Sequence, residues 1–339
     1  MGLNVLSLTV DSMDSAESQA RQARYAALLN EMAPGSRLWV QTRSGAKAWS
    51  AGAQQRGGVD LVVSQTPFVD GLRAWAIKLR RRVPWIAQLH VGSLNNPYWL
   101  QESAANWLRR VLGTVLLRQA DAVRVVSKSA EAWARGIGCK NVRVIPVGSA
   151  LVDKGLLSQR GPGWAVMYVG TVSRAKGIFT WLQALQHSGY GYAVVLGDGP
   201  DKGEAEWTAQ RLGLDHLTFV GECVPEQVAL VYGHGGILVS ASRHEAYGRV
   251  MAEGMAYGLP VVATDTEGAR DLVSEATGIR VAVDGWLQMA EAIGYLVRSP
   301  MLREAMGQAG REVVAAGHRP DELARQQVQL WMETVRGEA

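Results

Sequence analysis

The sequence predicts an α/β protein made of two doubly wound parallel sheets of the Rossmann type. Short runs rich in Val, Ile and Leu alternate with longer segments of helical period. Near-continuous apolar strands separated by helices are typical of parallel sheets covered on both faces. The alternation pauses near residue 157 and then resumes, and a chain of 339 residues with 47% apolar composition favours two domains.

The first half of the chain carries six candidate strands with helical segments between them. The strands are predicted at residues 5–10, 38–41, 61–64, 85–89, 122–126 and 142–146. Helical period is visible at residues 18–32 and 108–117. We therefore expect residues 1–156 to form the first domain.

A second α/β series follows a segment typical of a linker. Residues 153–163, DKGLLSQRGPG, combine charge, glycine and proline. Five more strands are predicted at residues 165–169, 193–196, 217–220, 236–240 and 261–263. Residues 157–318 are expected to form the second domain, and residues 319–339 a C-terminal helix that packs back on the first. Ligands of such sheets bind beyond the carboxyl ends of the strands, so two facing halves predict a cleft between them.

Composition and charge limit the class of protein. No stretch reaches the roughly 18 apolar residues of a spanning helix, and the first ten residues lack a Sec signal. Cys139 and Cys223 lie far apart without metal-ligand spacing, which fits a reducing compartment. Residues 1–150 hold 19 Lys+Arg against 9 Asp+Glu, whereas the rest hold 16 against 22. A basic half could meet nucleic acid, an anionic membrane or a phosphorylated acceptor.

Two glycine-bearing turns follow strands of the second half. The strand AVMYV runs into Gly170 and then TVSRAKG, whose Arg174 and Lys176 could hold a diphosphate. The alternative is an ordinary solvated turn. The segment LGDGPDKG does not have the glycine spacing of a dinucleotide fingerprint, so we expect a tight turn beside the cleft.

The segment SRHEAYGRVMAEG places Glu245 and Glu253 on either side of a small turn. A helix predicted up to Gly258 would leave backbone N–H groups of Ala246, Tyr247 and Gly248 near its N-terminus, where an anion is favoured. Eight helical positions span about 12 Å, comparable with the distance from a sugar ring to a ribose across two phosphates. The two carboxylates could therefore hold opposite ends of a nucleotide sugar.

The same segment has a structural alternative. Ser242 and Glu245 have the spacing of a capping box, in which each side chain accepts a backbone N–H of the other. Glu253 would then be an exposed helix residue without a special role. Spacing alone leaves both interpretations open.

Several motifs in a fixed order resemble the large family of retaining GT-B glycosyltransferases with two glutamates separated by seven residues. The motifs are ADAVRVVSKSAEAW, VRVIPVGSALVD, VGTVSRAKG, LGDGP, FVGECVPEQV and HEAYGRVMAEGMAYGLPVVATDTEG. The resemblance covers nearly the whole chain and is strongest to bacterial surface-polysaccharide transferases. It implies two Rossmann-like domains that face a cleft, with residues 1–156 on the acceptor side and residues 157–318 on the side of the donor. It also implies transfer of a sugar from a nucleotide-diphosphate sugar to a glycan or lipid-linked acceptor.

The resemblance also implies roles for residues of the second half. Glu253 would hold the ribose hydroxyls, and Glu245 would contact the transferred sugar. Backbone amides of residues 246–249, ending at Arg249, would receive phosphate or sugar oxygens. Lys176 would neutralise the diphosphate.

Two further positions are implied at other loops. The backbone of Val224, which follows FVGEC, would meet the base, and His90 would face the donor sugar, although a histidine can also simply close a strand. The family commonly has arginine after Gly170, whereas this chain has Thr171. Arg174 is the candidate replacement.

The implied mechanism uses no covalent nucleophile and no metal. Cations and helix-end amides stabilise the charge that develops on the departing diphosphate. The acceptor attacks on the same face of the sugar, with the leaving phosphate helping to deprotonate it. We see no acidic pair placed for a metal, and we expect no cofactor beyond the donor substrate.

Two arginine-rich amphipathic segments bear on the acceptor. LRAWAIKLRRRV and WLRRVLGTVLLR mix arginine with Trp and Leu, as in helices that lie on anionic membranes. The alternative is that the apolar residues pack on the sheet while the arginines stay solvated. The first interpretation predicts a cytoplasmic enzyme, peripheral on the inner membrane face, with a lipid-linked acceptor and no nucleic acid.

Two other functions remain open from the sequence. The first is an inverting GT-B transferase or a related sugar-nucleotide epimerase, which the anomeric configuration of the product would distinguish. The second is a non-catalytic nucleotide or nucleic-acid binding protein that uses the basic half, which would bind without turnover.

Overall fold

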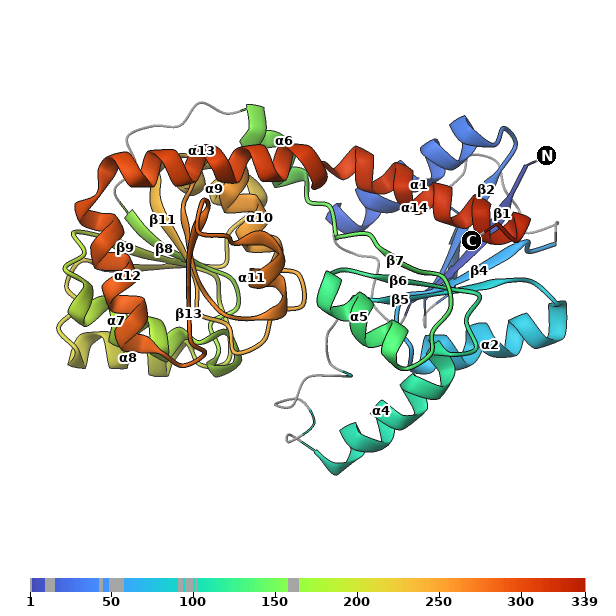
Figure 1. The fold of residues 1–339 in the computed structure, drawn as a ribbon, viewed down its shortest axis with the longest axis horizontal. Coiled ribbons are helices and arrows are strands. Elements are labelled where there is room, and N and C mark those ends of the chain that lie inside the picture. Colours follow the sequence, from blue (N-terminus) through green and yellow to red (C-terminus); the bar gives the residue numbers. More distant parts are fainter. Residues whose placement is uncertain are drawn as a thin grey trace. The chain divides into compact units, whose positions relative to one another are not determined.

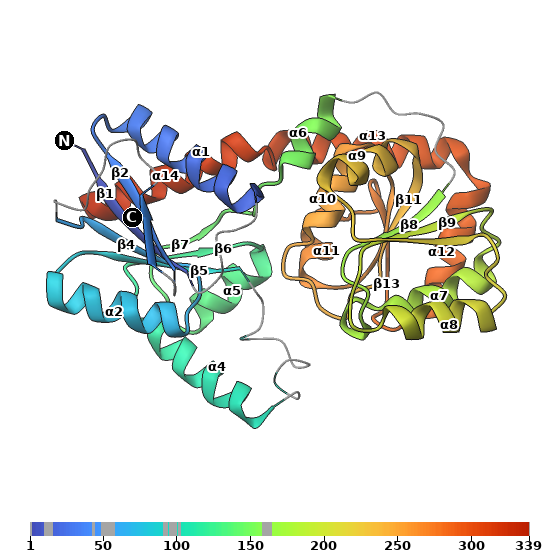
Figure 2. The same cartoon turned by 180° about the vertical axis from the view of Figure 1, so that it is seen from behind.

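The computed structural model divides the chain into two compact units, which are described separately (Figures 1 and 2). Unit 1 comprises Met1–Val147 and Asp321–Ala339, and unit 2 comprises Gly148–Pro320. The division falls before the expected boundary at residue 157, because the start of the expected linker belongs to helix α6 (Ala150–Leu157) of unit 2. The residues that the structure describes are 2–9, 16–42, 45–48, 58–90, 94, 100, 103–157 and 165–338.

Unit 1 contains a seven-stranded sheet in the order β3-β2-β1-β4-β5-β6-β7. All neighbouring strands are parallel except β2 and β3, which pair antiparallel at the edge. The strands are β1 (Asn4–Leu8), β2 (Arg37–Thr42), β3 (Gly45–Ala48), β4 (Leu61–Ser64), β5 (Trp85–Leu89), β6 (Ala122–Val125) and β7 (Val142–Val144). The helices are α1 (Ala16–Met32), α2 (Val69–Arg81), α4 (Ala104–Leu117), α5 (Lys128–Gly136) and α14 (Pro320–Arg336).

Helices cover both faces of the first sheet (Figures 1 and 2). On one face, side chains of α1 and α14 pack on the sheet, with Trp331 of α14 against Tyr25 of α1. On the other face, α2, α4 and α5 bury residues such as Ala74, Leu117 and Ala134. The residues expected to form a C-terminal helix therefore belong to the core of unit 1.

Unit 2 contains a six-stranded parallel sheet in the order β10-β9-β8-β11-β12-β13. The strands are β8 (Ala165–Val169), β9 (Ala193–Leu196), β10 (Leu217–Gly221), β11 (Gly235–Ser240), β12 (Val261–Thr264) and β13 (Gly278–Val281). The other elements are α7 (Ile178–Ser188), α8 (Lys202–Arg211), α9 (Pro225–His234), α10 (Arg249–Ala256), α11 (Glu267–Leu272), α12 (Trp286–Arg298), α13 (Pro300–Gly317) and the 3₁₀ turn η2 (Arg174–Lys176). The strand order reverses between β8 and β11, so the loops that follow these two strands flank a topological switch point.

The second sheet is also covered on both faces. Trp181 of α7, Ala205 of α8 and Ile293 of α12 are buried in one core beneath it. On the opposite face, α10 packs against α6 and α13, and a Cβ at Gly310 of α13 would already touch Met255 of α10. This packing fixes the helix that begins at the switch point.

The predicted fold class is confirmed: both units are doubly wound α/β sheets. All eleven predicted strands are present, with ends that differ by two residues or fewer. The edge strands β3 and β13 were not predicted, because GAKA and GIRV carry little continuous apolar signal. Within the described ranges, no helix combines the length and apolarity needed to cross a bilayer.

Candidate active site

The candidate site lies where the loops after β8 and β11 meet. Gly177 has φ of +72°, and a Cβ at this position would lie 1.9 Å from the carbonyl oxygen of Ala241. The backbone N–H of Arg243 donates to the carbonyl of Ala175 at 3.0 Å. Only glycine permits this approach without strain, so the sequence RAKG allows the first loop to reach the second.

Lys176 and Glu245 meet across these two loops. The Lys176 Nζ lies 2.6 Å from the Glu245 Oε2, and both side chains remain partly exposed. Ser173 helps to shape the first loop, because its Oγ accepts the N–H of Lys176 at 3.3 Å. The switch point of unit 2 thus holds an ammonium and a carboxylate in direct contact.

A pocket of about 260 Å³ contains this ion pair. Its wall includes Gly170 and Thr171 from the end of β8, and Arg249 from the start of α10. A second pocket of about 520 Å³ shares Gly170, Thr171 and Arg249 with the first. Its other lining residues include Asp198, Glu222 and Cys223. The two pockets therefore adjoin along the β8 loop.

The predicted helix is present as α10, and its start decides which backbone amides lie at its N-terminus. Gly248 is its N-cap with φ of +84°, and a Cβ there would lie 2.0 Å from the Met251 Cε. The helix therefore starts at Arg249, so its first-turn amides are not those of Ala246 and Tyr247. The two side chains are buried, and the Tyr247 hydroxyl lies 2.9 Å from Nδ1 of His318.

The capping-box alternative is wrong. Ser242 does not cap a helix: it is 4% exposed, and its carbonyl accepts the hydroxyl of Thr264. Glu245 precedes the helix, and its carbonyl accepts the N–H of Gly268 at 2.8 Å. The estimate of 12 Å from helical rise consequently does not apply to this pair of glutamates.

Glu253 is not the exposed helix residue of the structural alternative. It is 5% exposed, and its Oε1 accepts the Ser149 hydroxyl at 2.6 Å. The Tyr232 hydroxyl reaches the Oε2 at 3.4 Å, and the Arg249 Nε lies 3.6 Å from the Oε1. A buried carboxylate needs such partners to offset its lost hydration. Burial, and next the Glu253 charge, raise the pKa of Tyr232 well above its usual value, so the phenol remains a donor.

Arg174 does not join the pocket in which its charge was expected. Its guanidinium pairs with Glu204 of α8 and lies 4.6 Å from the ring centroid of Phe179. Its backbone N–H donates to the Asp201 carboxylate at 2.6 Å. The cations on the walls of the two pockets are instead Lys176 and Arg249.

The backbone of Val224 is engaged by helix α9. Its N–H donates to the Gln227 Oε1 at 3.0 Å, and its carbonyl accepts the N–H groups of Gln227 and Val228. Val224 does not line the second pocket, whereas the preceding residues Glu222 and Cys223 do. A base in that pocket would meet these two residues first.

His90 lies in unit 1, directly after β5. Its Nε2 is 3.1 Å from the Oε1 of Gln65, which follows β4. Burial lowers the pKa of His90 well below its usual value, and the charges of Arg124 and Arg21 lower it further. The imidazole is therefore neutral near pH 7. The role expected for it toward a donor stays a prediction.

Sequence reasoning missed several lining residues. Asp198 follows β9 in the tight turn LGDG, and a Cβ at Gly199 would lie 2.3 Å from the Val172 carbonyl oxygen. Thr171, Glu222 and Cys223 lie within the motifs VGTVSRAKG and FVGECVPEQV, but no role in the site was predicted for them. Their signal was position alone, because each lies just beyond a strand on the carboxyl edge of the sheet.

The described residues contain no cluster of three or more His, Cys, Asp or Glu side chains with the geometry of a metal site. The charged groups around the two pockets are instead an ammonium, a guanidinium and separate carboxylates. Such cations suit an anionic ligand.

Family models match both units. The model for glycosyl transferases group 1 matches residues 158–313, and the model for the glycosyl transferase 4-like domain matches residues 5–148. The alpha-D-kanosaminyltransferase of Streptomyces kanamyceticus is 33% identical over 161 residues, 44% of this chain and 41% of that protein. The lipopolysaccharide core biosynthesis glycosyltransferase LpsE of Rhizobium meliloti is 28% identical over 168 residues, 48% of each chain. The matched regions thus span less than half of either relative.

Solved structures share the fold over nearly the whole chain. A sucrose-phosphate synthase from Thermosynechococcus elongatus superposes with a TM-score of 0.81 at 21% identity, covering 99% of this chain and 100% of that one. Anabaena HepE in complex with UDP-glucose gives 0.73 at 17% identity, covering 98% and 100%. The chain therefore belongs to the glycosyltransferases of the GT-B fold, with a 4-like domain followed by a group 1 domain.

Proposed function

We propose that the chain transfers a sugar from a nucleotide-diphosphate sugar to a hydroxyl of a glycan or lipid-linked acceptor, with retention of anomeric configuration. The observation that carries this proposal is the Lys176–Glu245 contact at the switch point, beside two adjoining pockets that share Arg249. A carboxylate and two cations there can hold a sugar hydroxyl and a diphosphate together. Membership of a transferase family leaves no support for a non-catalytic binding protein.

The diphosphate would lie between Lys176 and Arg249. Both side chains are partly exposed and line the pocket that ends at the start of α10. The helix dipole adds positive potential at that point. We give the role first considered for Arg174 to Arg249, because Arg249 lines both pockets and Arg174 lines neither.

The chemistry needs no group that becomes covalently attached. The bond between the anomeric carbon and the diphosphate oxygen breaks, and the acceptor oxygen forms the new bond on the same face. The acceptor proton passes to the departing phosphate oxygen. Lys176 and Arg249 stabilise the negative charge that develops on that phosphate, and Glu245 holds the sugar and stabilises positive charge at its ring.

The ribose role of Glu253 is part of the proposal and has a structural condition. Its carboxylate already accepts hydroxyl groups from Ser149 and Tyr232. A ribose hydroxyl would have to displace the hydroxyl of Ser149 or Tyr232 and donate a hydrogen bond to the carboxylate in its place. The amides of Gly248 and Arg249 at the start of α10 would meet phosphate or sugar oxygens, and the base would lie near Glu222 and Cys223, next to Val224.

The acceptor and the cellular location are proposed on other grounds. One relative is named for lipopolysaccharide core biosynthesis, and unit 1 carries the basic, apolar-rich helices α2 and α4. These features support surface polysaccharide or glycolipid synthesis at the cytoplasmic membrane face. We propose that neither a metal nor a cofactor takes part.

A thermal-shift screen tests the donor site. UDP-, GDP-, ADP- and dTDP-sugars are added separately, and at least one should raise the midpoint of unfolding, because a ligand that binds the folded state stabilises it by mass action. The same donor should then yield a product whose anomeric proton shows the configuration of the donor. Failure of every donor contradicts the proposal, and an inverted product favours the inverting alternative.

A further inference from the structure

Unit 1 exposes an unusual concentration of large apolar side chains on two neighbouring helices. We define the α2–α4 face by Val69, Leu72, Trp75 and Leu79 of α2 and by Trp107, Leu108, Val111, Leu112 and Val115 of α4. These are nine of the 19 large hydrophobic side chains that are exposed among the described residues. The other ten are distributed over many elements, so the concentration is specific to this face.

The exposed side chains of α4 lie on one side of the helix. Residues 107, 108, 111, 112 and 115 recur at the spacing of one helical face, whereas Gly113, Leu116 and Leu117 are buried. Trp107 is 63% exposed and Leu108 is 66% exposed. The buried side is already packed, because a Cβ at Gly113 would lie 3.1 Å from Leu94. The apolar side that remains stays exposed, with no partner among the described residues of unit 1.

Helices α2 and α4 cover the same face of the sheet and touch through their inner sides. A Cβ at Gly71 of α2 would lie 3.7 Å from the Leu116 side chain of α4. Figures 1 and 2 show both helices on the side of the sheet opposite α1 and α14, with the amino-terminal half of α4 extending beyond the sheet. The two apolar stripes therefore belong to one layer of the unit.

The charges around this face are almost all positive. Asp70 is the sole acidic residue in 69–82 and 104–118, and it is buried. The exposed cations in these two ranges are Arg73, Arg80, Arg81, Arg82, Arg109 and Arg118. Across the described residues, no carboxylate is paired with Arg80, Arg81 or Arg82. A second copy of this chain docked face to face would bring these arginines together, which disfavours self-association.

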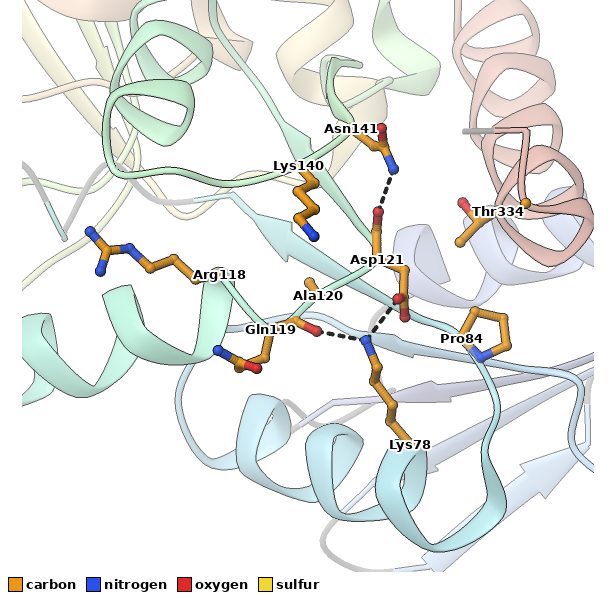
Figure 3. Close-up of a pocket in the computed structure, with 10 residues that line it drawn as sticks. Lys78, Pro84, Arg118, Gln119, Ala120, Asp121, Lys140, Asn141 and Thr334 are labelled. Carbon is orange, nitrogen blue, oxygen red and sulfur yellow. Dashed lines mark hydrogen bonds and ion pairs between the residues drawn. The ribbon is translucent and has the colours of Figure 1, made fainter.

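The carboxyl-terminal ends of α2 and α4 meet at a pocket of about 370 Å³ (Figure 3). Lys78 is neutralised there, because its Nζ lies 2.7 Å from the Asp121 carboxylate and 2.7 Å from the Gln119 carbonyl oxygen. Arg118 and Lys140 also line the pocket, so its net charge stays positive. The positive potential thus continues from the arginines of α2 around the end of the face.

We propose that the α2–α4 face binds the surface of an anionic lipid bilayer. The Trp and Leu side chains would enter the boundary between headgroups and acyl chains, and the arginines would contact the lipid phosphates. This inference rests on the proposed function, because the lipid-linked acceptor is part of that proposal. It gives the enzyme a surface that holds unit 1 against the bilayer in which such an acceptor is embedded.

Flotation with lipid vesicles tests the proposal on the full chain. The parent protein should float with phosphatidylglycerol vesicles and not with phosphatidylcholine vesicles, and added salt should weaken binding. The Trp107→Ser/Leu108→Ser and Arg80→Gln/Arg81→Gln variants should each bind about tenfold less. Because all four side chains are exposed, the midpoint of thermal unfolding should not change. The control is Trp207→Ser/Arg211→Gln, which removes an exposed Trp–Arg pair of unit 2 and should bind like the parent.

Three outcomes overturn the proposal. The parent does not float with anionic vesicles, the α2–α4 variants float as well as the parent, or sedimentation without lipid shows a dimer that these variants dissociate. Donor binding, followed without vesicles by thermal shift, should be the same in parent and variants. If no donor binds but the protein and its variants float as expected, the proposed function is contradicted and the membrane-binding surface is still supported.

Discussion

The two units share a strand order but differ in the chemistry at the carboxyl edges of their sheets. Unit 2 presents Lys176, Glu245 and Arg249 around adjoining pockets. In unit 1, the residues that directly follow β4 and β5 are Gln65 and a neutral His90. Unit 1 carries a group of exposed arginines on its outer helices α2 and α4. The comparison teaches that one scaffold can carry charge at a ligand site or at a docking surface, according to which positions receive it.

Among the substitutions that test this difference between the units, removal of the Lys176 ammonium should have the largest effect on activity. We expect Lys176→Met to lower kcat by about 100- to 1,000-fold, the usual loss when a group that stabilises transition-state charge is deleted. The matched control is Lys154→Met, which breaks an exposed ion pair with Glu226 in the same unit. Equal losses in the two variants would show that Lys176 has no special role.

The next largest effect should come from a substitution at Gly177, where the two loops of the site approach each other. Gly177→Ala places a Cβ 1.9 Å from the Ala241 carbonyl oxygen, so the free energy of unfolding should fall by about 3 kcal/mol or more. Gly189→Ala is the control, since this residue has φ of +68° but open space around its Cβ. It should cost only about 1–2 kcal/mol. Denaturant unfolding measures both, and equal costs would refute the loop contact.

Ser149→Ala tests whether Glu253 binds the ribose of the donor or only stabilises the fold. The variant removes a hydroxyl that donates to the buried carboxylate, so the ligand-free protein should lose about 2 kcal/mol of stability. A ribose hydroxyl that takes the vacated place should raise donor affinity by up to about tenfold. Ser127→Ala, which removes only a helix cap in unit 1, should leave donor affinity unchanged. Weaker donor binding by Ser149→Ala in calorimetry contradicts the ribose role.

The neutral state of His90 predicts a smaller, pH-dependent effect. Its pKa is lowered in the folded state, so the unfolded chain binds the proton more readily below its usual pKa of about 6.5. Stability should therefore fall with decreasing pH, by about 1.4 kcal/mol per pH unit from this group, and level off above about pH 7. His244 and His318 add to the parent slope, so the test is the difference between the parent and His90→Gln. Equal slopes in the two proteins would contradict a neutral imidazole at His90.

The sequence predicted the sheets well because buried parallel strands are continuous apolar runs. It missed β3 and β13, whose signals are short, and it placed the domain boundary inside α6 because charge and glycine there resemble a linker. It predicted which loops form the site but not which charged side chains pair within them. Arg174 pairs with Glu204, 30 residues away, and such a contact has no local signal. The sequence also placed the Ala246 and Tyr247 amides at the N-terminus of α10, whereas the N-cap is Gly248, whose φ of +84° glycine permits but does not dictate.

The central claim is that Glu245 contacts the transferred sugar beside Lys176, and Glu245→Gln tests it most directly. This substitution keeps the size of the side chain and removes its charge. Turnover should be measured across the donor panel for the parent, for Glu245→Gln and for Glu226→Gln, an exposed partner of Lys154. We expect turnover to fall by about 100-fold or more in Glu245→Gln and to stay at the parental rate in Glu226→Gln. Parental turnover by Glu245→Gln with every donor that the parent uses would contradict it.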